Sequence, residues 1–132
     1  MAMVRTAEPA DVPRLADLLD EMGRFYGDHS DERPAFRVRH VEQALFGDGA
    51  SIAALLAVDG DDVIGLASYS FLWPAAGLTR SLYLKELYVR QRRRSQGTGR
   101  ALMHELISLA RREGCSRVEW TTEDGNDEAK RF

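Results

Sequence analysis

Residues 92–106, RRRSQGTGRALMHEL, join a run of arginines to two closely spaced glycines and then to an amphipathic helical pattern. The segment before them, SLYLKELYV (81–89), is rich in β-forming residues and predicts a strand. The segment after them, RVEWTTE (117–123), predicts another. A helix that connects two strands forms a crossover, so we expect these strands to lie parallel in one sheet, with the glycine turn at the start of the helix.

The first third of the chain predicts one strand and two helices. Residues 4–7 form the strand, and Asp11 is expected to cap the first helix. Gly27 ends this helix, and Gly47 ends the second, which follows a polar loop at residues 28–34. The apolar face of the first helix consists of residues at helical spacing: Leu15, Leu18, Leu19 and Met22.

From residue 51 onward the pattern changes from helical to extended. Apolar, β-prone residues fill SIAALLAV (51–58) and VIGLASYSFLW (63–73), and the acidic turn between them predicts a hairpin. With the strand at 81–89, this hairpin makes an antiparallel meander of three strands. The predicted order is βααβββαβ, an α/β (α+β) fold with a mixed, mostly antiparallel central sheet flanked by helices.

Composition predicts one domain and excludes a general polyanion binder. A chain of 132 residues with 44% hydrophobic and 30% charged residues fits a single core, so we expect one domain over residues 1–132. The net charge of -3 requires any anion site to be local. The basic run RQRRR (90–94) lacks the interleaved aromatic residues of a nucleic-acid surface, so we expect no nucleic-acid partner.

Cysteine usage and hydropathy predict the compartment. The single cysteine, Cys115, cannot form an internal disulfide, and the three histidines show no zinc-ligand spacing with it, so no metal is expected. No apolar run approaches the ~18 residues that would span a bilayer, and the N-terminal segment has no long apolar core. These patterns predict a cytoplasmic protein without a membrane partner.

The strand, the glycine turn and the helix together predict an anion site. The first backbone N–H groups of a helix have no partner within it, and those of residues 95–100 would converge on one point. Gly97 and Gly99 let a ligand approach the backbone, while Arg94 and Arg100 add positive charge at the rim. The glycines are followed by no Lys-Ser/Thr pair and by no third glycine, which excludes a Walker loop and the dinucleotide fingerprint.

The segment RSQGTG (94–99) resembles the R/Q-x-x-G-x-G/A motif with which the GCN5-related N-acetyltransferases (the GNAT family) bind the pyrophosphate of acetyl-CoA. The predicted strand order is similar to that of the family, and Asn126, Ala129 and Phe132 match its N-x-x-A/S-x-x-F segment. Within the family, the R-x-A-x-x-A-D start at residues 5–11 and the strand LYLKELYV look most like the diamine (spermidine/spermine-like) acetyltransferases.

The resemblance implies contacts for acetyl-CoA, which would serve as co-substrate. The backbone of Leu87, Tyr88 and Val89 would pair with the pantetheine arm like an added strand. Asn126 and Ala129 would lie along the other side of the cofactor. The pyrophosphate would be bound by the glycine turn and its neighbours: Arg94, Ser95, Gln96, Gly97, Thr98, Gly99 and Arg100.

Acetyl transfer to an amine requires a proton acceptor, because an amine of pKa near ~10.4 is almost entirely protonated at pH 7. Glu86 is the candidate base, and a backbone N–H near Leu87 would stabilise the negative charge on the attacked carbonyl oxygen. Neighbouring side chains of a regular strand point to opposite faces, so Lys85 and Glu86 would not both face the substrate. Which of the two does so stays open.

The diamine branch places its amine pocket at the end of the first helix and on the fifth strand, which implies Phe25, Tyr26, Glu119 and Thr121 as substrate-binding residues. The alternative for Phe25 and Tyr26 is packing at the helix end. Lys85 stands where that branch carries an acid, and its charge would disfavour a polycationic substrate. The expected substrate is a small molecule with a primary amine.

The family commonly has a tyrosine after the position of Phe132, which protonates the departing thiolate, and then a final pair of strands; both lie beyond the end of this sequence. The strand at 117–123 is therefore expected to present an open edge, which a homodimer would cover. Without the acid, the alternative to an active enzyme is a catalytically weak acyl-CoA-binding module.

Overall fold

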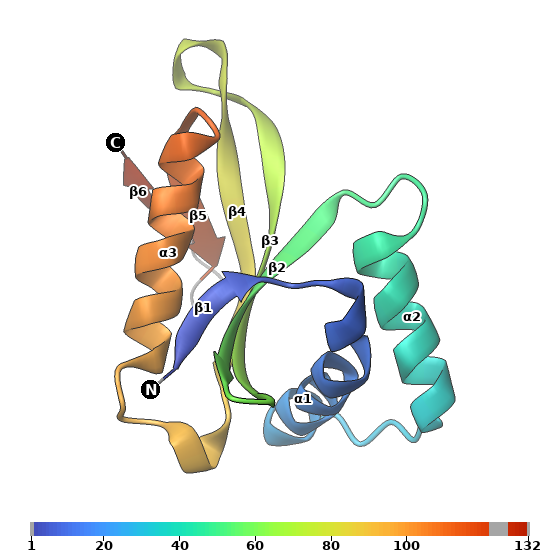
Figure 1. Cartoon of the computed structure of the whole chain (residues 1–132). Helices are drawn as coiled ribbons and strands as arrows, with labels where there is room; N and C mark the ends of the chain where they lie inside the picture. Colours follow the sequence, from blue (N-terminus) through green and yellow to red (C-terminus); the bar gives the residue numbers. More distant parts are fainter. Residues whose placement is uncertain (1, 122–126, 132) are drawn as a thin grey trace.

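The computed structural model describes residues 2–121 and 127–131, which build one six-stranded sheet with helices on both faces (Figure 1). The strands are β1 (Met3–Thr6), β2 (Ile52–Asp59), β3 (Asp62–Ala75), β4 (Thr79–Val89), β5 (Cys115–Thr121) and β6 (Asp127–Arg131). The α-helices are α1 (Val12–Phe25), α2 (Pro34–Phe46) and α3 (Thr98–Arg112). Short 3-10 turns lie at Pro9–Asp11, Ala76–Leu78 and Gln91–Arg93.

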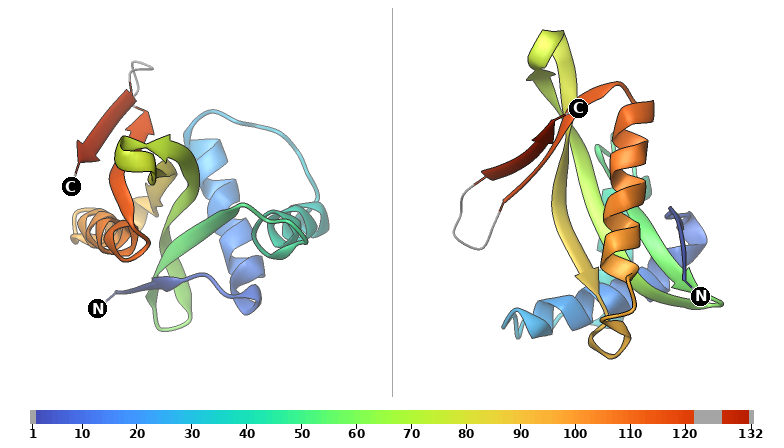
Figure 2. Two further views of the ribbon diagram at one scale, coloured as in Figure 1. Left: turned by 90° about the horizontal axis from the view of Figure 1, so that it is seen from above. Right: turned by 90° about the vertical axis from the view of Figure 1, so that its left-hand side faces the viewer.

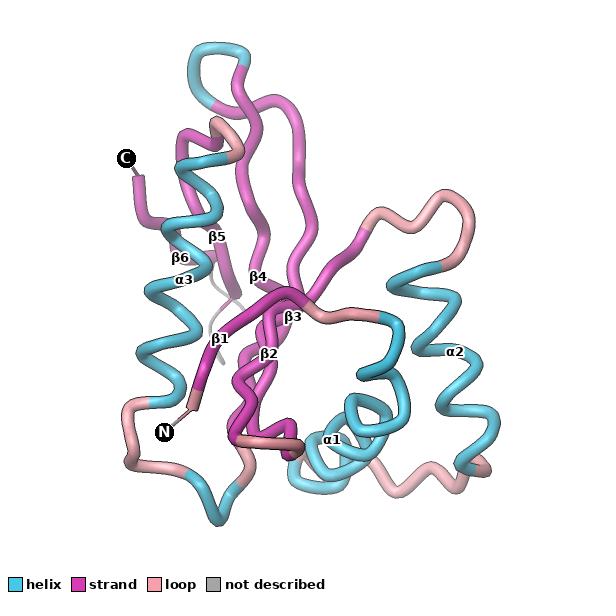
Figure 3. The backbone as a smooth tube through the Cα atoms, in the orientation of Figure 1, coloured by secondary structure: helices cyan, strands magenta, loops and turns pink. Residues whose placement is uncertain are grey.

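The strands lie in the sheet in the same order as in the chain, from β1 to β6 (Figure 3). The pairs β1–β2, β2–β3 and β3–β4 are antiparallel, β4–β5 is parallel, and β5–β6 is antiparallel. Helix α3 forms the crossover between the two parallel strands. The predicted mixed, mostly antiparallel sheet, with its meander and its single parallel pair, is confirmed.

Helix α3 covers one face of the sheet, and α1 and α2 cover the other (Figures 1 and 2). Leu102, Leu106 and Ala110 of α3 are completely buried, in one cluster with Leu82 of β4 and Val118 of β5. Their spacing of four residues places all three on one stripe of the helix, which explains how a single helix seals this face.

The opposite face is covered less tightly. Leu15 and Leu18 of α1 are buried against β2 and β3, and Leu19 and Met22 contact the same cluster, as the helical spacing predicts. No residue of α2 is buried, and α2 reaches this cluster through partly buried positions: Val41 and Leu45. Of the three α-helices, α2 therefore contributes least to the buried core.

The edge of β5 that the sequence predicts to be open is paired. Strand β6 runs antiparallel to it, from Arg117↔Arg131 to Thr121↔Asp127. The sequence of β6, DEAKR, lacks β-forming residues, so no pattern predicts this strand. The pairing instead provides partners for the backbone N–H and C=O groups along the edge of β5. Among the described strands, β6 rather than β5 is therefore at the edge of the sheet, and the homodimer stays a prediction.

Asp11 does not cap α1 through its side chain, contrary to the prediction. Its carboxylate accepts two hydrogen bonds of 2.8 Å from the Arg5 guanidinium and one of 2.7 Å from the Glu8 N–H. The side chain of Asp11 is buried, and the hydrogen bonds from Arg5 hold the pKa of this carboxyl below its usual value. The R-x-A-x-x-A-D start thus fastens β1 to the beginning of α1.

Candidate functional site

The site begins where β4 separates from β5. Among the described residues, the parallel pairing of these two strands ends at Leu84↔Trp120. Of the described strands, only β3 lies beside β4 beyond this point, through the pairs Ala67↔Leu87 and Gly65↔Val89. The last residues of β4 therefore have one edge that faces a gap in the sheet.

Backbone groups of β4 point into this gap. The Arg90 N–H donates to the Ile64 carbonyl oxygen at 2.8 Å, which makes this a hydrogen-bonded antiparallel pair. Because such pairs alternate along the strand, Leu87 and Val89 are non-hydrogen-bonded positions towards β3. Their N–H and C=O groups face the gap, where an extended ligand could pair with them.

A β-bulge interrupts β4 just before this edge. Opposite one step along β3, β4 advances from Leu84 to Glu86, so Lys85 is an extra residue in the strand. Leu84 and Leu87 both pack in the cluster beneath α3, although two residues rather than one separate them. Regular alternation therefore does not assign Lys85 and Glu86 to opposite faces, which corrects the sequence-based expectation. Lys85 is exposed and Glu86 is partly buried.

The glycine turn places the start of α3 at the same gap. Gly97 has φ +82° in the left-handed region, and a Cβ at this position would meet nothing within 4 Å. No side chain caps α3 at Gly97, and the Ala101 N–H makes the first helical bond to the Gly97 carbonyl oxygen at 3.0 Å. The backbone N–H groups that precede it have no partner within the helix.

A third glycine, in the interior, brings α3 close to the strands. A Cβ on Gly65 of β3 would lie 3.1 Å from the Tyr88 carbonyl oxygen and 3.2 Å from Leu102 Cδ1. A larger side chain would have to displace the backbone of β4 at Tyr88 or Leu102 of α3. At Gly99, by contrast, the nearest atom to a Cβ is Leu87 Cδ2 at 3.7 Å, which is ordinary contact.

These features converge on an open groove of about 750 Å³. The end of β4, the glycine turn, the start of α3 and the end of α1 line it: Phe25, Tyr26, Leu87, Tyr88, Val89, Arg93, Arg94, Ser95, Gly97, Thr98, Gly99 and Arg100. Most of the residues predicted to bind the cofactor therefore lie together. Gln96, also predicted, does not line the groove; its side-chain oxygen accepts a hydrogen bond of 3.4 Å from Arg93 Nε.

The basic run at residues 90–94 does not act as one anion-binding cluster. Arg90 is buried, with Nε donating to the Val63 carbonyl oxygen at 2.9 Å. Its terminal nitrogens form ion pairs with Glu21 at 3.0 Å and with Asp17 at 3.3 Å. Arg90 is thus a structural residue that joins α1 to the end of β4, which the sequence pattern did not reveal.

Arg93 forms an ion pair with Asp59 at the end of β2, although it also lines the groove. Together with the internal bond to Gln96, this pair holds the turn against the β2–β3 hairpin. Arg94 lies against the groove wall instead. The sequence prediction of local positive charge at the glycines therefore rests on Arg94 and Arg100, both of which are exposed.

Glu21 of α1 organises the aromatic wall of the groove. Its carboxylate accepts hydrogen bonds from the Tyr88 hydroxyl at 2.8 Å and from the Gln91 N–H at 3.4 Å, besides the ion pair with Arg90. Burial and the hydrogen bond to Glu21 raise the pKa of Tyr88 to about 12. Burial alone would raise the pKa of Glu21, but the hydrogen bonds from Tyr88, Arg90 and Gln91 bring it below its usual value.

The end of α1 completes this wall. The ring of Phe25 lies 5.8 Å from that of Tyr88 and 5.1 Å from that of Tyr26, measured between centroids. The guanidinium of Arg94 lies 4.6 Å from the Phe25 centroid and 5.2 Å from the Tyr88 centroid. Arg94 Nε also donates a hydrogen bond of 3.0 Å to the Val89 carbonyl oxygen.

The four residues predicted to bind substrate fall into two groups. Phe25 and Tyr26 line the groove together with residues predicted to bind the cofactor. Glu119 and Thr121 lie on β5 outside it: Glu119 pairs with Arg117 at 3.4 Å, and the Thr121 hydroxyl lies 2.6 Å from the Tyr83 hydroxyl. The structure does not join the two groups into one pocket.

Of the predicted C-terminal cofactor contacts, the structure describes only Ala129. Ala129 lies in β6, opposite Glu119, on the side of β5 away from β4. Asn126 and Phe132 lie outside the described residues. The place of Ala129 in the sheet therefore does not support its predicted contact with the cofactor, and the contact of Asn126 stays a prediction.

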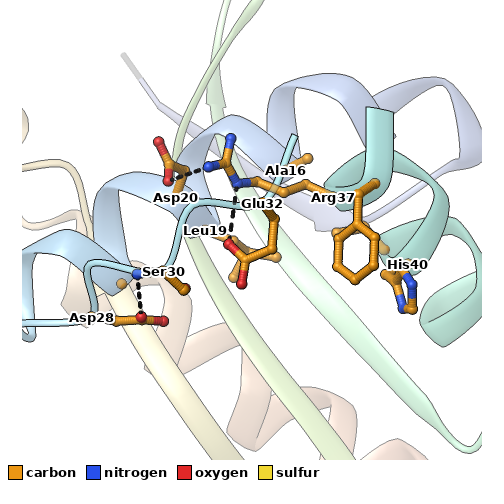
Figure 4. A pocket seen from close by; sticks show the side chains of 11 residues that line it. Ala16, Leu19, Asp20, Asp28, Ser30, Glu32, Arg37 and His40 are labelled. Carbon is orange, nitrogen blue, oxygen red and sulfur yellow. Dashed lines mark hydrogen bonds and ion pairs between the residues drawn. The ribbon is translucent and has the colours of Figure 1, made fainter. Parts of the chain in front are cut away.

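A second, smaller pocket of about 230 Å³ lies between α1 and α2 (Figure 4). Arg37 of α2 reaches into it and forms ion pairs with Asp20 of α1 at 3.3 Å and with Glu32 at 3.9 Å. The ring of Phe36 stacks on that of His40 with centroids 4.0 Å apart. These contacts hold α2 to α1, and the pocket is separate from the groove.

The part of the chain that the structure describes contains neither a candidate metal site nor a membrane-spanning helix. Residues 2–121 and 127–131 contain no group of three or more His, Cys, Asp or Glu side chains arranged to hold a metal ion. Within the same ranges, no helix has both the length and the apolar character that crossing a membrane requires.

Sequence comparisons identify the family of this chain. The model of the acetyltransferase (GNAT) family matches residues 14–132. The thialysine N-epsilon-acetyltransferase of Bos taurus is 26% identical over 139 residues, which cover 96% of this chain and 78% of that protein.

Structural comparisons agree with this family assignment. An integron cassette protein from the mobile metagenome of V. cholerae has a TM-score of 0.84 at 25% identity, over 92% of this chain and 75% of that one. A probable acetyltransferase has a TM-score of 0.81 at 21% identity, over 94% and 81% of the two chains, which is a likeness of fold. Because the family model spans nearly the whole chain and the fold agrees with it, this chain belongs to the GNAT family of acetyltransferases.

Proposed function

We propose that this chain transfers the acetyl group of acetyl-CoA to the primary amine of a small molecule, by direct attack within a ternary complex. Membership of the GNAT family implies acyl-CoA-dependent acetyl transfer, with acetyl-CoA as co-substrate. The observation that carries the proposal is the groove in which the free edge of β4 meets the start of α3. It offers an extended backbone edge and a helix N-terminus side by side.

The start of α3 suits the pyrophosphate. The space in front of Gly97 is open, so phosphate oxygens can approach the unpaired N–H groups of the first helical turn without meeting a Cβ. The helix dipole favours negative charge at this end, and Arg100 adds a positive charge. The fit is one of both shape and charge.

The edge of β4 suits the pantetheine arm. Leu87 and Val89 direct their N–H and C=O groups into the gap beside β5, so the amides of an extended ligand can pair with them as an additional strand. This arrangement would bring the thioester to the bulge at Lys85, near the point where the two strands separate. There the Leu87 N–H is the candidate donor to the carbonyl oxygen as negative charge develops on it.

Glu86 is the proposed base, acting directly or through a water molecule. It lies at the bulge, next to Leu87, and is partly buried. In the proposed reaction, Glu86 accepts a proton from the ammonium group, and the neutral nitrogen bonds to the acetyl carbon. The carbon–sulfur bond then breaks and the thiolate leaves; the nitrogen releases its second proton to solvent, and the thiolate takes one up from solvent. No covalent acyl-enzyme is required.

The charges at the bulge favour a small amine over a polycation. Lys85 is exposed beside Glu86, so a second positive charge on the substrate would be repelled there. The matched mammalian relative is named for acetylation of the ε-amine of thialysine, and we propose that this chain likewise acts on an amine at the end of a short chain. This proposal replaces a polyamine with a small molecule of lower net positive charge.

Calorimetric titration with acetyl-CoA tests the cofactor site. We expect the wild-type chain to bind with micromolar affinity and the Gly97→Glu variant to lose binding, because the new carboxylate would occupy the pyrophosphate position. Gly114→Glu is the matched control: Gly114 has φ +73°, a Cβ there meets nothing within 4 Å, and it follows the opposite end of α3. Equal loss of binding in both variants, or no binding by the folded wild type, would contradict the proposal.

A thiol-release assay with a panel of amines then tests the chemistry. Glu86→Gln should lower kcat by about 10²–10⁴-fold, the usual contribution of a positioned base, while the affinity for acetyl-CoA stays unchanged. If acetyl-CoA binds but the wild-type chain releases no thiol with any amine of the panel, the chain is an acyl-CoA-binding module rather than an enzyme.

A further inference from the structure

Arg94 occupies the part of the groove that the pantetheine arm would need. Its Nε donates to the Val89 carbonyl oxygen at 3.0 Å, and its guanidinium lies over the rings of Phe25 and Tyr88 at 4.6 and 5.2 Å. The contact is within the groove itself, because all four residues line it. One acceptor of the proposed binding edge, the Val89 carbonyl oxygen, is therefore already bonded to a side chain of the protein.

The Val89 carbonyl is one of the few groups at this edge that an arriving amide can use. Val89 is a non-hydrogen-bonded position towards β3, so its C=O faces the gap that the ligand would enter. An amide N–H that pairs with this oxygen competes with Arg94 Nε. The ligand must also displace the guanidinium from the two aromatic faces, which loses a cation–π contact.

Whether the displacement is compensated depends on the ligand. A pyrophosphate group bound at the start of α3 can accept new charge-assisted hydrogen bonds from the displaced guanidinium, because Arg94 is only a few residues before this helix in the chain. A thioester without phosphate provides none. Such a ligand must break the Arg94 contacts and gains nothing from the released arginine.

We propose that Arg94 selects the acyl donor, by excluding phosphate-free thioesters from the β4 edge and admitting those that carry a pyrophosphate. This inference rests on the proposed function, because it assumes that the arm pairs with β4. It gives Arg94 two opposite effects: it strengthens binding of acetyl-CoA and weakens binding of the same acyl arm without its nucleotide. Discrimination of this kind acts against the wrong ligand as well as for the right one.

The experiment compares the two opposite effects of Arg94 on ligand affinity. Acetyl-CoA and S-acetylpantetheine, which has the same arm and no phosphate, are titrated into the wild type and into Arg94→Ala. The variant should bind acetyl-CoA about 10- to 100-fold more weakly, because it loses charge-assisted hydrogen bonds. It should bind S-acetylpantetheine about three- to tenfold more tightly, because one competing hydrogen bond is gone.

Arg100→Ala is the matched control. Arg100 lines the same groove and carries the same charge, but among the described residues the side chain that donates to the Val89 carbonyl oxygen is that of Arg94. This variant should also weaken acetyl-CoA binding, and it should leave the affinity for S-acetylpantetheine unchanged. Arg94→Gln, which keeps an N–H donor for the carbonyl but no charge, replaces Arg94→Ala if the alanine variant does not fold. Its S-acetylpantetheine affinity should also rise, by less.

The outcomes separate the two proposals. If the wild type binds acetyl-CoA but Arg94→Ala binds S-acetylpantetheine no more tightly than the wild type does, this inference is overturned and the proposed function stands. Absence of detectable S-acetylpantetheine binding by both proteins, up to the solubility limit, counts as the same result. If the folded wild type does not bind acetyl-CoA, the proposed function fails, and the inference fails with it.

Discussion

The two faces of the sheet are held in different ways. On one face, α3 buries three residues completely against the strands, and its first turn lies against β3 at Gly65. On the other face, α1 is anchored by buried leucines and by Glu21, whereas α2 has no buried residue. The face covered by α3, whose start is the proposed anion site, is therefore packed more tightly, and we expect substitutions in α2 to cost the core little.

The largest effect should come from the α3 side. Leu106→Ala removes a completely buried side chain and should lower the free energy of unfolding by about 3 kcal/mol. Leu45→Ala on α2 removes a side chain that is only partly buried. It should cost about 1 kcal/mol, because less buried apolar area is lost than at Leu106. Urea denaturation of both variants measures the difference. Equal losses would show that α2 is held as firmly as α3.

The next effect tests the close approach at Gly65. Gly65→Ala should lower the free energy of unfolding by about 2 kcal/mol, because its Cβ would lie 3.1 Å from the Tyr88 carbonyl oxygen. The same variant should weaken acetyl-CoA binding as the start of α3 moves. At Gly99, where contact would be ordinary, alanine should leave stability unchanged or raise it by up to about 1 kcal/mol. A stable Gly65→Ala variant with unaltered binding would refute this account.

A smaller effect, dependent on pH, tests the anchor of α1. The pKa of Asp11 is lowered in the folded protein, so its bond to Arg5 stabilises the fold above the unfolded pKa of about 3.9 and is lost as the pH falls through the folded pKa. Asp11→Asn should cost about 1–2 kcal/mol at pH 7, and the difference from wild type should shrink steadily below pH 4. Thermal unfolding across this pH range checks it; a gap that persists in acid would argue for a purely steric role.

The smallest effect belongs to α2. Arg37→Met removes the ion pairs to Asp20 and Glu32, and partly exposed pairs of this kind contribute about 0.5 kcal/mol. The midpoint of urea unfolding, compared at low and high salt, should therefore differ little between the variant and the wild type. A loss comparable to that of Leu106→Ala would mean that the comparison between the two faces is mistaken.

Periodicity was sufficient for most of the fold. The helical spacing of Leu15 and Leu18, and of Leu102 and Leu106, predicts which faces are buried, because burial follows directly from hydrophobic repeat. Strand β6 could not be predicted in this way, since its residues are polar and its pairing is a backbone interaction.

The site was predictable only where a motif is local. The glycines at 97 and 99 and the strand before them are close in sequence, and they lie together. Glu21 and Tyr88 are 67 residues apart in the sequence, and no local pattern predicts the hydrogen bond between them. The bulge at Lys85 depends on the register with β3, which a single strand does not encode. The predicted roles of these residues stay predictions until the titrations are made.

The gap between β4 and β5 has a consequence for the lifetime of the protein in the cell. The edge of β4 beyond Leu84 has no partner among the described strands on the side of β5. A ligand that pairs with this edge binds the folded chain and not the unfolded one. At a hundredfold excess over its Kd, such a ligand adds about 2.7 kcal/mol to the free energy of unfolding. The abundance of this protein would then follow the supply of the metabolite that completes its sheet.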